Sequence, residues 1–210
     1  SATGGLRFPL YCSHKPKRRC FAMTWQNSLT NQFLIAMPAM EDPNFTQTVT
    51  YICEHTEQGA LGIVINRPMS EVHLGDLLEQ LDVSPKQPDV AKRPIFAGGP
   101  VQPEHGFILH RPAQSWESTL QIDAQIGLTT SQDILTAIAH GEGPGEALIA
   151  LGYAGWGAGQ LEQELADNAW LSVPVNYEVL FHVPAEHRWQ QAAALLGVDL
   201  SLMSSDAGHA

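Results

Sequence analysis

The stretch that decides the fold is Ala150–Ala166, which reads ALGYAGWGAGQLEQELA. It starts in an apolar run, ends in a segment typical of a helix, and places glycines at positions 152, 155, 157 and 159. Glycine adopts backbone conformations that other residues avoid, so such a segment can turn the chain sharply. We expect a strand at Ala147–Tyr153, then a glycine turn, then a helix that buries Leu161 and Leu165.

This stretch does not match a dinucleotide-binding loop. That fingerprint requires G-x-G-x-x-G, and from Gly155 the sequence reads GWGAGQ, so Gln160 stands where the last glycine should be. The stretch also comes late in the chain, outside any βαβ unit, and no phosphate-binding G-x-x-x-x-G-K-[ST] motif occurs elsewhere. We interpret the glycines as a tight corner around Trp156. The alternative is that N–H groups at the start of the helix bind an anion or small ligand.

Composition limits the classes of protein to consider. The chain has 210 residues, of which 44% are hydrophobic, and a formal net charge of -11. No apolar run approaches the roughly 20 residues that a membrane-spanning helix needs. Three cysteines without CxxC spacing favour a reducing compartment, so we expect a cytoplasmic protein that contacts no membrane.

The first 22 residues differ from the rest of the chain. They hold five of the eleven basic residues, two of the three cysteines (Cys12 and Cys20) and no acidic residue. We expect residues 1–22 to be a disordered extension or an artefact of cloning or gene prediction, residues 23–198 to form one domain, and residues 199–210 to be a polar tail. Without the extension, six basic residues face 22 acidic ones, so the domain repels phosphate backbones and direct nucleic-acid binding is not expected. The basic tract Lys15–Arg19 is either an exception or, as we favour, a solvated tail.

The apolar pattern predicts more strands than helices. Strands are expected at Phe33–Met37, Thr48–Cys53, Ala60–Asn66, Ile95–Ala97, Phe107–His110, Thr119–Ile122, Ile126–Thr129, Ala147–Tyr153 and Val179–Val183. Helices are expected at Leu74–Leu81, from a capping-box variant at Thr130–Asp133 to His140, after Gly159, and around Trp189, Ala193 and Leu196, with a single turn at Asp42–Pro43 and a loop at Val83–Pro94. Because the strands come in neighbouring groups, we predict a single α+β domain with a mixed, mostly antiparallel sheet.

The sequence contains few candidates for chemistry. Cys53 and His55 share one side of a predicted strand, so Cys53 is either an activated or redox-active thiol or, as we favour, a buried one. Nine histidines show no metal-ligand spacing, and neither a G-x-S-x-G motif nor a Ser-His-Asp order is present. We therefore expect no metal, no cofactor and no catalytic residues. Arg67, at a strand end, is interpreted as half of a structural ion pair with a carboxylate, with an anionic ligand as the alternative.

Three segments together resemble the AlgH/YqgE family of bacterial cytoplasmic proteins: FLIAMPAMEDPNFTQTVTYICEHTEQGALGIVINRP, FAGGPV and GYAGWGAGQLEQELADNAWL. The resemblance covers about Leu29 to Leu196. It implies a strongly bent sheet flanked by helices, and no catalytic residues. Members are often described as transcriptional regulators of alginate or exopolysaccharide production.

The function expected from the residues and this resemblance is a binding or regulatory module. It would act as a monomer, with a small molecule or a protein as partner. Several of the family's motif positions fall at strand ends and loops, and we predict that they line one ligand-binding cleft: Glu54, His55, Asn66, Arg67, Gly98, Gly99, Gly155, Trp156 and Gln160. The alternatives are a transcriptional regulator, direct or acting through a partner, and a thiol-dependent enzyme or redox sensor that uses Cys53.

Overall fold

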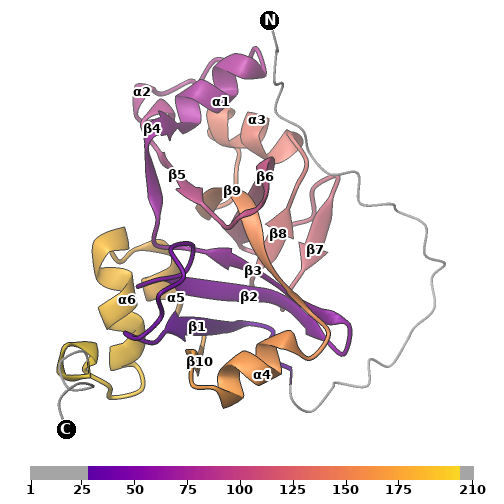
Figure 1. The fold of residues 1–210 in the computed structure, drawn as a ribbon. Helices are drawn as coiled ribbons and strands as arrows, with labels where there is room; N and C mark the ends of the chain where they lie inside the picture. The colour runs from indigo at the N-terminus through magenta and orange to yellow at the C-terminus, as the bar shows by residue number, and fades with distance from the viewer. Residues whose placement is uncertain (1–27, 204–210) are drawn as a thin grey trace, which may run out of the picture.

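The computed structural model describes residues 28–203. The predicted extension at 1–22, with Cys12, Cys20 and the basic tract, lies outside the described residues, as does most of the predicted tail. Within the described part, ten strands form one continuous sheet that is covered by six α-helices (Figure 1). The predicted α+β class is confirmed.

The main path of the sheet runs through eight strands, and two more extend it at one side. Their order is β10 (Trp170–Pro174), β1 (Gln32–Ala36), β2 (Val49–Thr56), β3 (Gly59–Val64), β9 (Glu146–Gly157), β6 (Val101–Arg111), β8 (Gly127–Thr129) and β7 (Thr119–Gln121). Off this path, β5 (Pro94–Ala97) pairs with both β9 and β4 (Pro68–His73). The β5–β9 pair is parallel and the other pairs are antiparallel, so the sheet is mixed and mostly antiparallel, as predicted.

Strand β9 belongs to both halves of the sheet. Its end, Ala154–Gly157, pairs with β3, whereas its first part pairs with β6 on one side and β5 on the other. Between these parts Gly152 has a φ of +75°, and the register with β6 shifts at the same place. Figure 1 shows β9 crossing from the upper strands to the lower ones. The strand predicted at Ala147–Tyr153 therefore continues to Gly157, and the predicted glycine turn is wrong for residues 154–157; the turn is confined to Ala158 and Gly159.

A close backbone contact holds β9 at this point. Added β-carbons at Gly98 and Gly99 would lie 2.4 Å from the Gly152 carbonyl oxygen and 2.1 Å from the Tyr153 carbonyl carbon. The Gly98 N–H donates to the Leu151 carbonyl at 2.8 Å, and the Gly98 carbonyl accepts from Val64 N at 2.9 Å. Only glycine allows two backbones to approach so closely.

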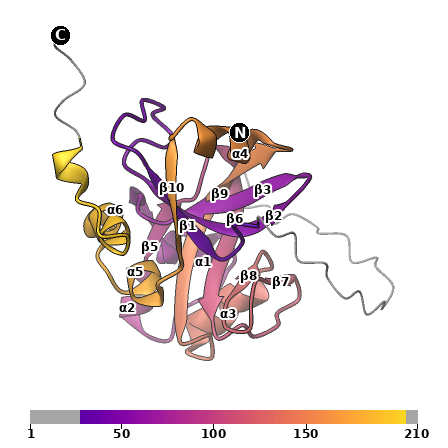
Figure 2. The same cartoon turned by 90° about the horizontal axis from the view of Figure 1, so that it is seen from below.

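The helices cover different parts of the sheet. One group comprises α1 (Leu74–Gln80), α2 (Pro88–Ala91) and α3 (Asp133–His140), which pack on an apolar cluster that includes Ile95, Ile108 and Ile149. Another pair, α5 (Tyr177–Phe181) and α6 (Ala185–Ala194), lies together on a different side of the molecule, away from α3 (Figures 1 and 2). The helix α4 (Gln160–Ala166) contacts β3, β9 and β10. A short 3₁₀ helix, Leu200–Leu202, buries Leu200.

Most predicted elements are present, with four differences. The segment predicted as a strand at Val179–Val183 contains the end of α5, which Asn176 caps by accepting from Val179 N at 3.1 Å. A short apolar run does not distinguish strand from helix. The predicted loop at Val83–Pro94 contains α2, which has proline in its first turn. The capping box before α3 does not form, since Gln132 is the N-cap and makes no side-chain cap bond. Strands β4 and β10 were not predicted.

No helix within residues 28–203 is long and apolar enough to cross a membrane.

Replacing Gly99 by alanine will lower the free energy of unfolding by roughly 3 kcal/mol or more, because a strained backbone and a steric clash combine there. Gly141 is the matched control, since its φ is also positive, +78°, but nothing lies within 4 Å of an added β-carbon. Gly141→Ala therefore measures strain alone, about 1–2 kcal/mol. Urea unfolding followed by circular dichroism gives both values. Equal losses in the two variants would show that the contact with β9 is unimportant.

Candidate functional site

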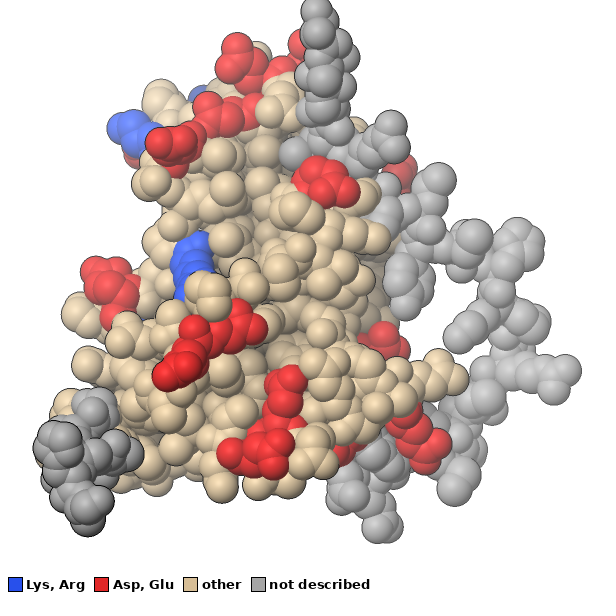
Figure 3. Space-filling view, in the orientation of Figure 1, with Lys and Arg blue, Asp and Glu red and all other residues tan. Residues whose placement is uncertain are grey.

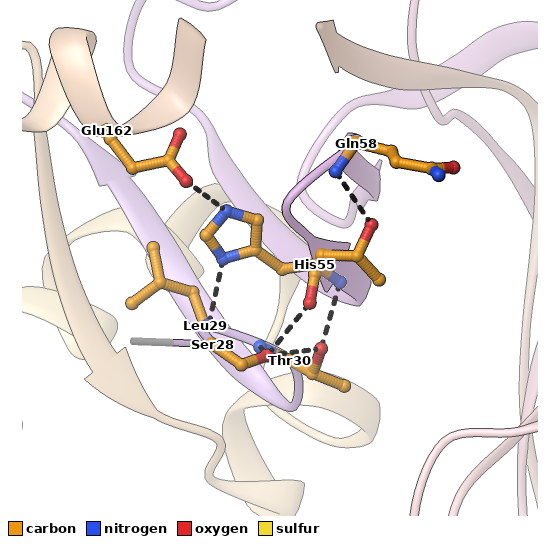
Figure 4. A network of polar contacts seen from close by, with 7 residues as sticks. Ser28, Leu29, Thr30, His55, Gln58 and Glu162 are labelled. Atoms are coloured by element: carbon orange, nitrogen blue, oxygen red, sulfur yellow. Dashed lines mark hydrogen bonds and ion pairs between the residues drawn. The ribbon is translucent and has the colours of Figure 1, made fainter. Parts of the chain in front are cut away.

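His55, a predicted site residue on β2, is buried and bonded within the chain (Figure 4). Its Nδ1 accepts from Leu29 N at 3.0 Å, so Nε2 carries the proton and donates to Glu162 Oε1 at 3.0 Å. The His55 backbone N–H donates to Thr30 Oγ1 at 2.9 Å. The imidazole thus joins residues 28–30 to α4. Its neighbour Glu54 is exposed.

Arg67, just before β4, bonds to the loop that precedes β2. Its Nη1 donates to the carbonyls of Pro43 and Asn44 at 2.8 Å each, and Nη2 donates to the Thr46 carbonyl at 2.9 Å. Among the residues that the structure describes, Arg67 makes no ion pair. The predicted ion pair is therefore wrong, because the partners of the guanidinium are backbone carbonyls. An anionic ligand of Arg67 stays a prediction.

The same loop is held from a second side by Asn66. The Asn66 Oδ1 accepts from Val49 N and Nδ2 donates to the Gln47 carbonyl, each at 2.9 Å. Within the loop, Thr46 N donates to the Asp42 carbonyl at 2.8 Å, so the single turn predicted at Asp42–Pro43 is present.

Trp156 and Gln160 converge on the carboxylate of Glu164. Glu164 Oε2 accepts from the indole N–H groups of Trp156 at 2.9 Å and Trp170 at 2.8 Å, and Oε1 accepts from Gln160 Nε2 at 2.9 Å. The Gln160 Oε1 accepts from Gly157 N at 3.0 Å, and Gly155 pairs with Leu61 in the sheet. Gly155 and Gly157 therefore take part in contacts within the protein itself.

The predicted site residues are distributed over three contact networks, centred on His55, Arg67 and Glu164. In each network the polar groups named above bond to the protein itself. Gly98 and Gly99 pack against backbone. That a ligand binds across these residues stays a prediction, and a pocket in the described structure is formed by other residues.

Cys53 is 2% exposed and lies in the main apolar core, where its S–H donates to the Tyr51 carbonyl at 3.8 Å. Burial, and next to it the charge of Glu54, raises the pKa of the thiol. A neutral and inaccessible thiol is a poor nucleophile and a poor redox sensor. The hypothesis of a thiol-dependent function for Cys53 is therefore wrong. Nor do residues 28–203 contain a cluster of three or more His, Cys, Asp or Glu side chains that could hold a metal ion.

A pocket of about 270 Å³ lies between the parallel pair β5–β9 and the two helices α5 and α6. Three apolar side chains form its floor, Phe96 from β5, Leu148 from β9 and Leu180 from α5, and each is at most 5% exposed. The remaining lining residues are Arg93, Pro94, Gly145, Glu146, Ala147, Ile149, Phe181, His182 and Arg188.

Arg188 is the most unusual of these residues, because a cation on α6 is only 6% exposed. Its Nε donates to the Val183 carbonyl at 2.8 Å, and its Nη1 donates to the Ile65 carbonyl. The guanidinium carbon lies 5.1 Å from the centre of the Phe96 ring. Burial lowers the pKa of Arg188 to about 10, so the side chain is still a cation at neutral pH.

At the rim of the pocket, the carboxylate of Glu146 contacts two neighbours. Its Oε1 lies 2.5 Å from His182 Nε2, and its Oε2 lies 3.3 Å from Arg111 Nη1. Arg111 is itself fixed above the Tyr177 ring, 4.5 Å from the ring centre. Arg93 is exposed at the same rim. Polar groups of both charges therefore meet at one opening.

The gathering of cations here stands out because the domain is acidic. Figure 3 shows one face on which acidic side chains are widely spread and basic ones are sparse. Residues 28–203 contain six basic residues, and three of them, Arg93, Arg111 and Arg188, line the pocket or hold its rim.

Sequence reasoning missed this site. Its cations are far apart in the chain and form no spacing motif. His182 directly follows α5, in a segment that the pattern predicted as a strand. The one available signal was an arginine beside the buried face of the predicted last helix.

Comparison with known proteins identifies the family to which the chain belongs. Residues 33–201 match the family model described as AlgH-like, DUF179. The chain belongs to the AlgH-like family. The resemblance found in the sequence is thereby confirmed.

AlgH-like relatives are close in sequence and length. A UPF0301 protein of Thioalkalivibrio sulfidiphilus is 58% identical over 188 residues, covering 90% of this chain and 100% of the relative. A UPF0301 protein of Nitrosococcus oceani is 57% identical over 180 residues, 86% of this chain and 96% of the relative. These names state no reaction, so an activity has to be argued from the structure.

Two solved structures share the AlgH-like fold. The solution structure of AlgH from Pseudomonas aeruginosa is 53% identical, with a TM-score of 0.72, and the match covers 88% of this chain and 97% of that one. A crystal structure from Corynebacterium diphtheriae is 19% identical, with a TM-score of 0.65 and coverage of 88% and 96%, and shows the fold alone.

Replacing His55 by alanine will lower the free energy of unfolding by about 2 kcal/mol, because the bonds to Leu29 and Glu162 are lost from a buried position. Glu54→Ala, the exposed neighbour, is the matched control and will change stability by at most about 0.5 kcal/mol. Both values come from urea unfolding. If His55→Ala unfolded like the control, the imidazole would not be the structural link described here.

Cys53 will react with Ellman's reagent roughly 100-fold more slowly in the native protein than in concentrated guanidinium chloride, because burial keeps it protonated and inaccessible. The measurement uses a C12S/C20S variant, in which Cys53 is the only thiol. A rate in native buffer equal to that of a free thiol would restore the redox hypothesis.

Proposed function

We propose that this AlgH-like chain is a binding module whose ligand site is the pocket between β5, β9, α5 and α6. The observation that carries the proposal is the pocket itself, with a buried apolar floor and polar groups that converge on one opening. Small-molecule sites in proteins combine apolar walls with fixed polar groups that orient the ligand, and this pocket contains both kinds of surface.

The size of the pocket limits the ligand. At about 270 Å³ it lies just below the roughly 300–1,000 Å³ typical of sites for drug-sized molecules. We infer a ligand with a single ring or a short aliphatic chain. A nucleotide or a folded peptide is too large to enter.

A regulatory role for this binding stays a prediction. Direct contact with DNA is disfavoured by charge, since only six basic residues accompany 22 acidic ones after residue 22. Regulation through a protein partner is compatible with a ligand site and needs no basic surface.

The test is to screen small acids, amides and alcohols by ¹H–¹⁵N NMR on the full chain. Ligands of the proposed site will shift the amide signals of Phe96, Leu148 and Leu180, which come from three different elements of the pocket. Replacing His182 by tryptophan narrows the mouth and will weaken such ligands at least about tenfold.

His187→Trp is the matched control, because His187 is exposed nearby on α6 and does not line the pocket. It will leave the affinity unchanged. If no compound shifts the pocket signals, or if His182→Trp binds as tightly as His187→Trp, the proposal is wrong.

A further inference from the structure

The chemistry of the ligand can be inferred from Arg188, and this inference rests on the proposed function. Two of the three guanidinium nitrogens, Nε and Nη1, donate to the backbone carbonyls of Val183 and Ile65. The third, Nη2, has no acceptor within residues 28–203, and it keeps some solvent-accessible surface. One edge of the fork is therefore still available to a molecule in the pocket.

The positive charge of Arg188 also has no counterion in the described chain. No carboxylate lies within 4.0 Å of it; Glu186, two residues earlier on α6, acts on it from beyond that distance. Glu146, the acidic residue of the pocket, is occupied by His182 and Arg111. An unpaired charge in a desolvated position is costly, so an anion that enters the pocket gains a favourable partner.

The surroundings of Arg188 define the rest of the ligand. Phe96, Leu148 and Leu180 form the floor beside it, so the body that follows the charged group must be apolar. The planar guanidinium matches the planar geometry of a carboxylate. A phosphate ester would carry a second negative charge close to the Glu146 carboxylate, where like charges repel.

We propose that the pocket binds a small monocarboxylate, such as an aromatic or short aliphatic acid, through Arg188. The carboxylate pairs with the free edge of the guanidinium, and the apolar body fills the space over Phe96, Leu148 and Leu180. Arg93 at the rim assists the entry of the anion and is not its partner.

The test compares three probes of one shape on the wild-type chain: benzoate, benzamide and phenyl phosphate. Benzoate will shift the pocket amide signals and also the side-chain Nε–H signal of Arg188. Its affinity will exceed that of benzamide at least about tenfold, because the amide carries no charge. Phenyl phosphate will bind more weakly than benzoate.

Substitution of the arginine provides an independent measurement. Arg188→Gln will abolish the preference for benzoate over benzamide, whereas Arg93→Gln, the control at the rim, will change it less than about threefold. Arg188 also holds two backbone carbonyls. If Arg188→Gln does not fold, the three-probe comparison and the Arg188 side-chain signal in the wild type decide.

The outcomes separate this inference from the function on which it rests. Equal affinity of benzoate and benzamide, with both in the pocket, would overturn the carboxylate inference and leave the binding module standing. Tighter binding of phenyl phosphate would replace the carboxylate by a phosphoryl group. If no probe shifts the pocket signals, both proposals fall.

Discussion

The contact between two backbones, Gly98–Gly99 against Gly152–Tyr153, is the constraint on which the rest of the structure depends. Without side chains at positions 98 and 99, the chain leaving β5 passes directly over β9 and bonds to it. Gly152 lets β9 change course there, so one strand serves both halves of the sheet. Because β5 is thereby held parallel to β9, the two strands present Phe96 and Leu148 side by side as the floor of the pocket.

The family signature turns out to maintain the fold. Arg67 caps the carbonyls of the loop before β2, and Glu164 collects two indole N–H groups and an amide. Buried polar groups in proteins are nearly always hydrogen-bonded. The polar residues of the family motifs meet this requirement by bonding to groups on other segments of the same chain. Apart from Phe96, the candidate ligand site uses residues outside the quoted motifs, including Arg93, His182 and Arg188.

Local patterns predicted well wherever a local cause decided the structure. Strands β2 and β3, α1 with its leucine spacing, and the end of α3 at His140 follow from local periodicity. The predictions were wrong where contacts with residues far away in the sequence determine the structure. Residues 179–181, predicted as strand, belong to a helix that packs on the sheet, and residues 154–157, predicted as a turn, are strand because β3 pairs with them. Arg67 was identified as a fixed side chain, but its partners are carbonyls more than 20 residues away, which no spacing reveals.

The sequence by itself determined the family, the α+β class, the scarcity of basic residues and the absence of known nucleotide, metal and hydrolase motifs. These properties depend on composition and on short sequence patterns, which can be read directly from the sequence. Only the tertiary structure decided that Cys53 is inaccessible, that the glycine stretch is largely strand, and that three of the six basic residues within 28–203 line one pocket or hold its rim. Such properties arise from packing between segments that are far apart in sequence. The burial of a side chain and its distance from opposite charges set its reactivity and its ability to bind a ligand, and residue identity alone does not reveal them.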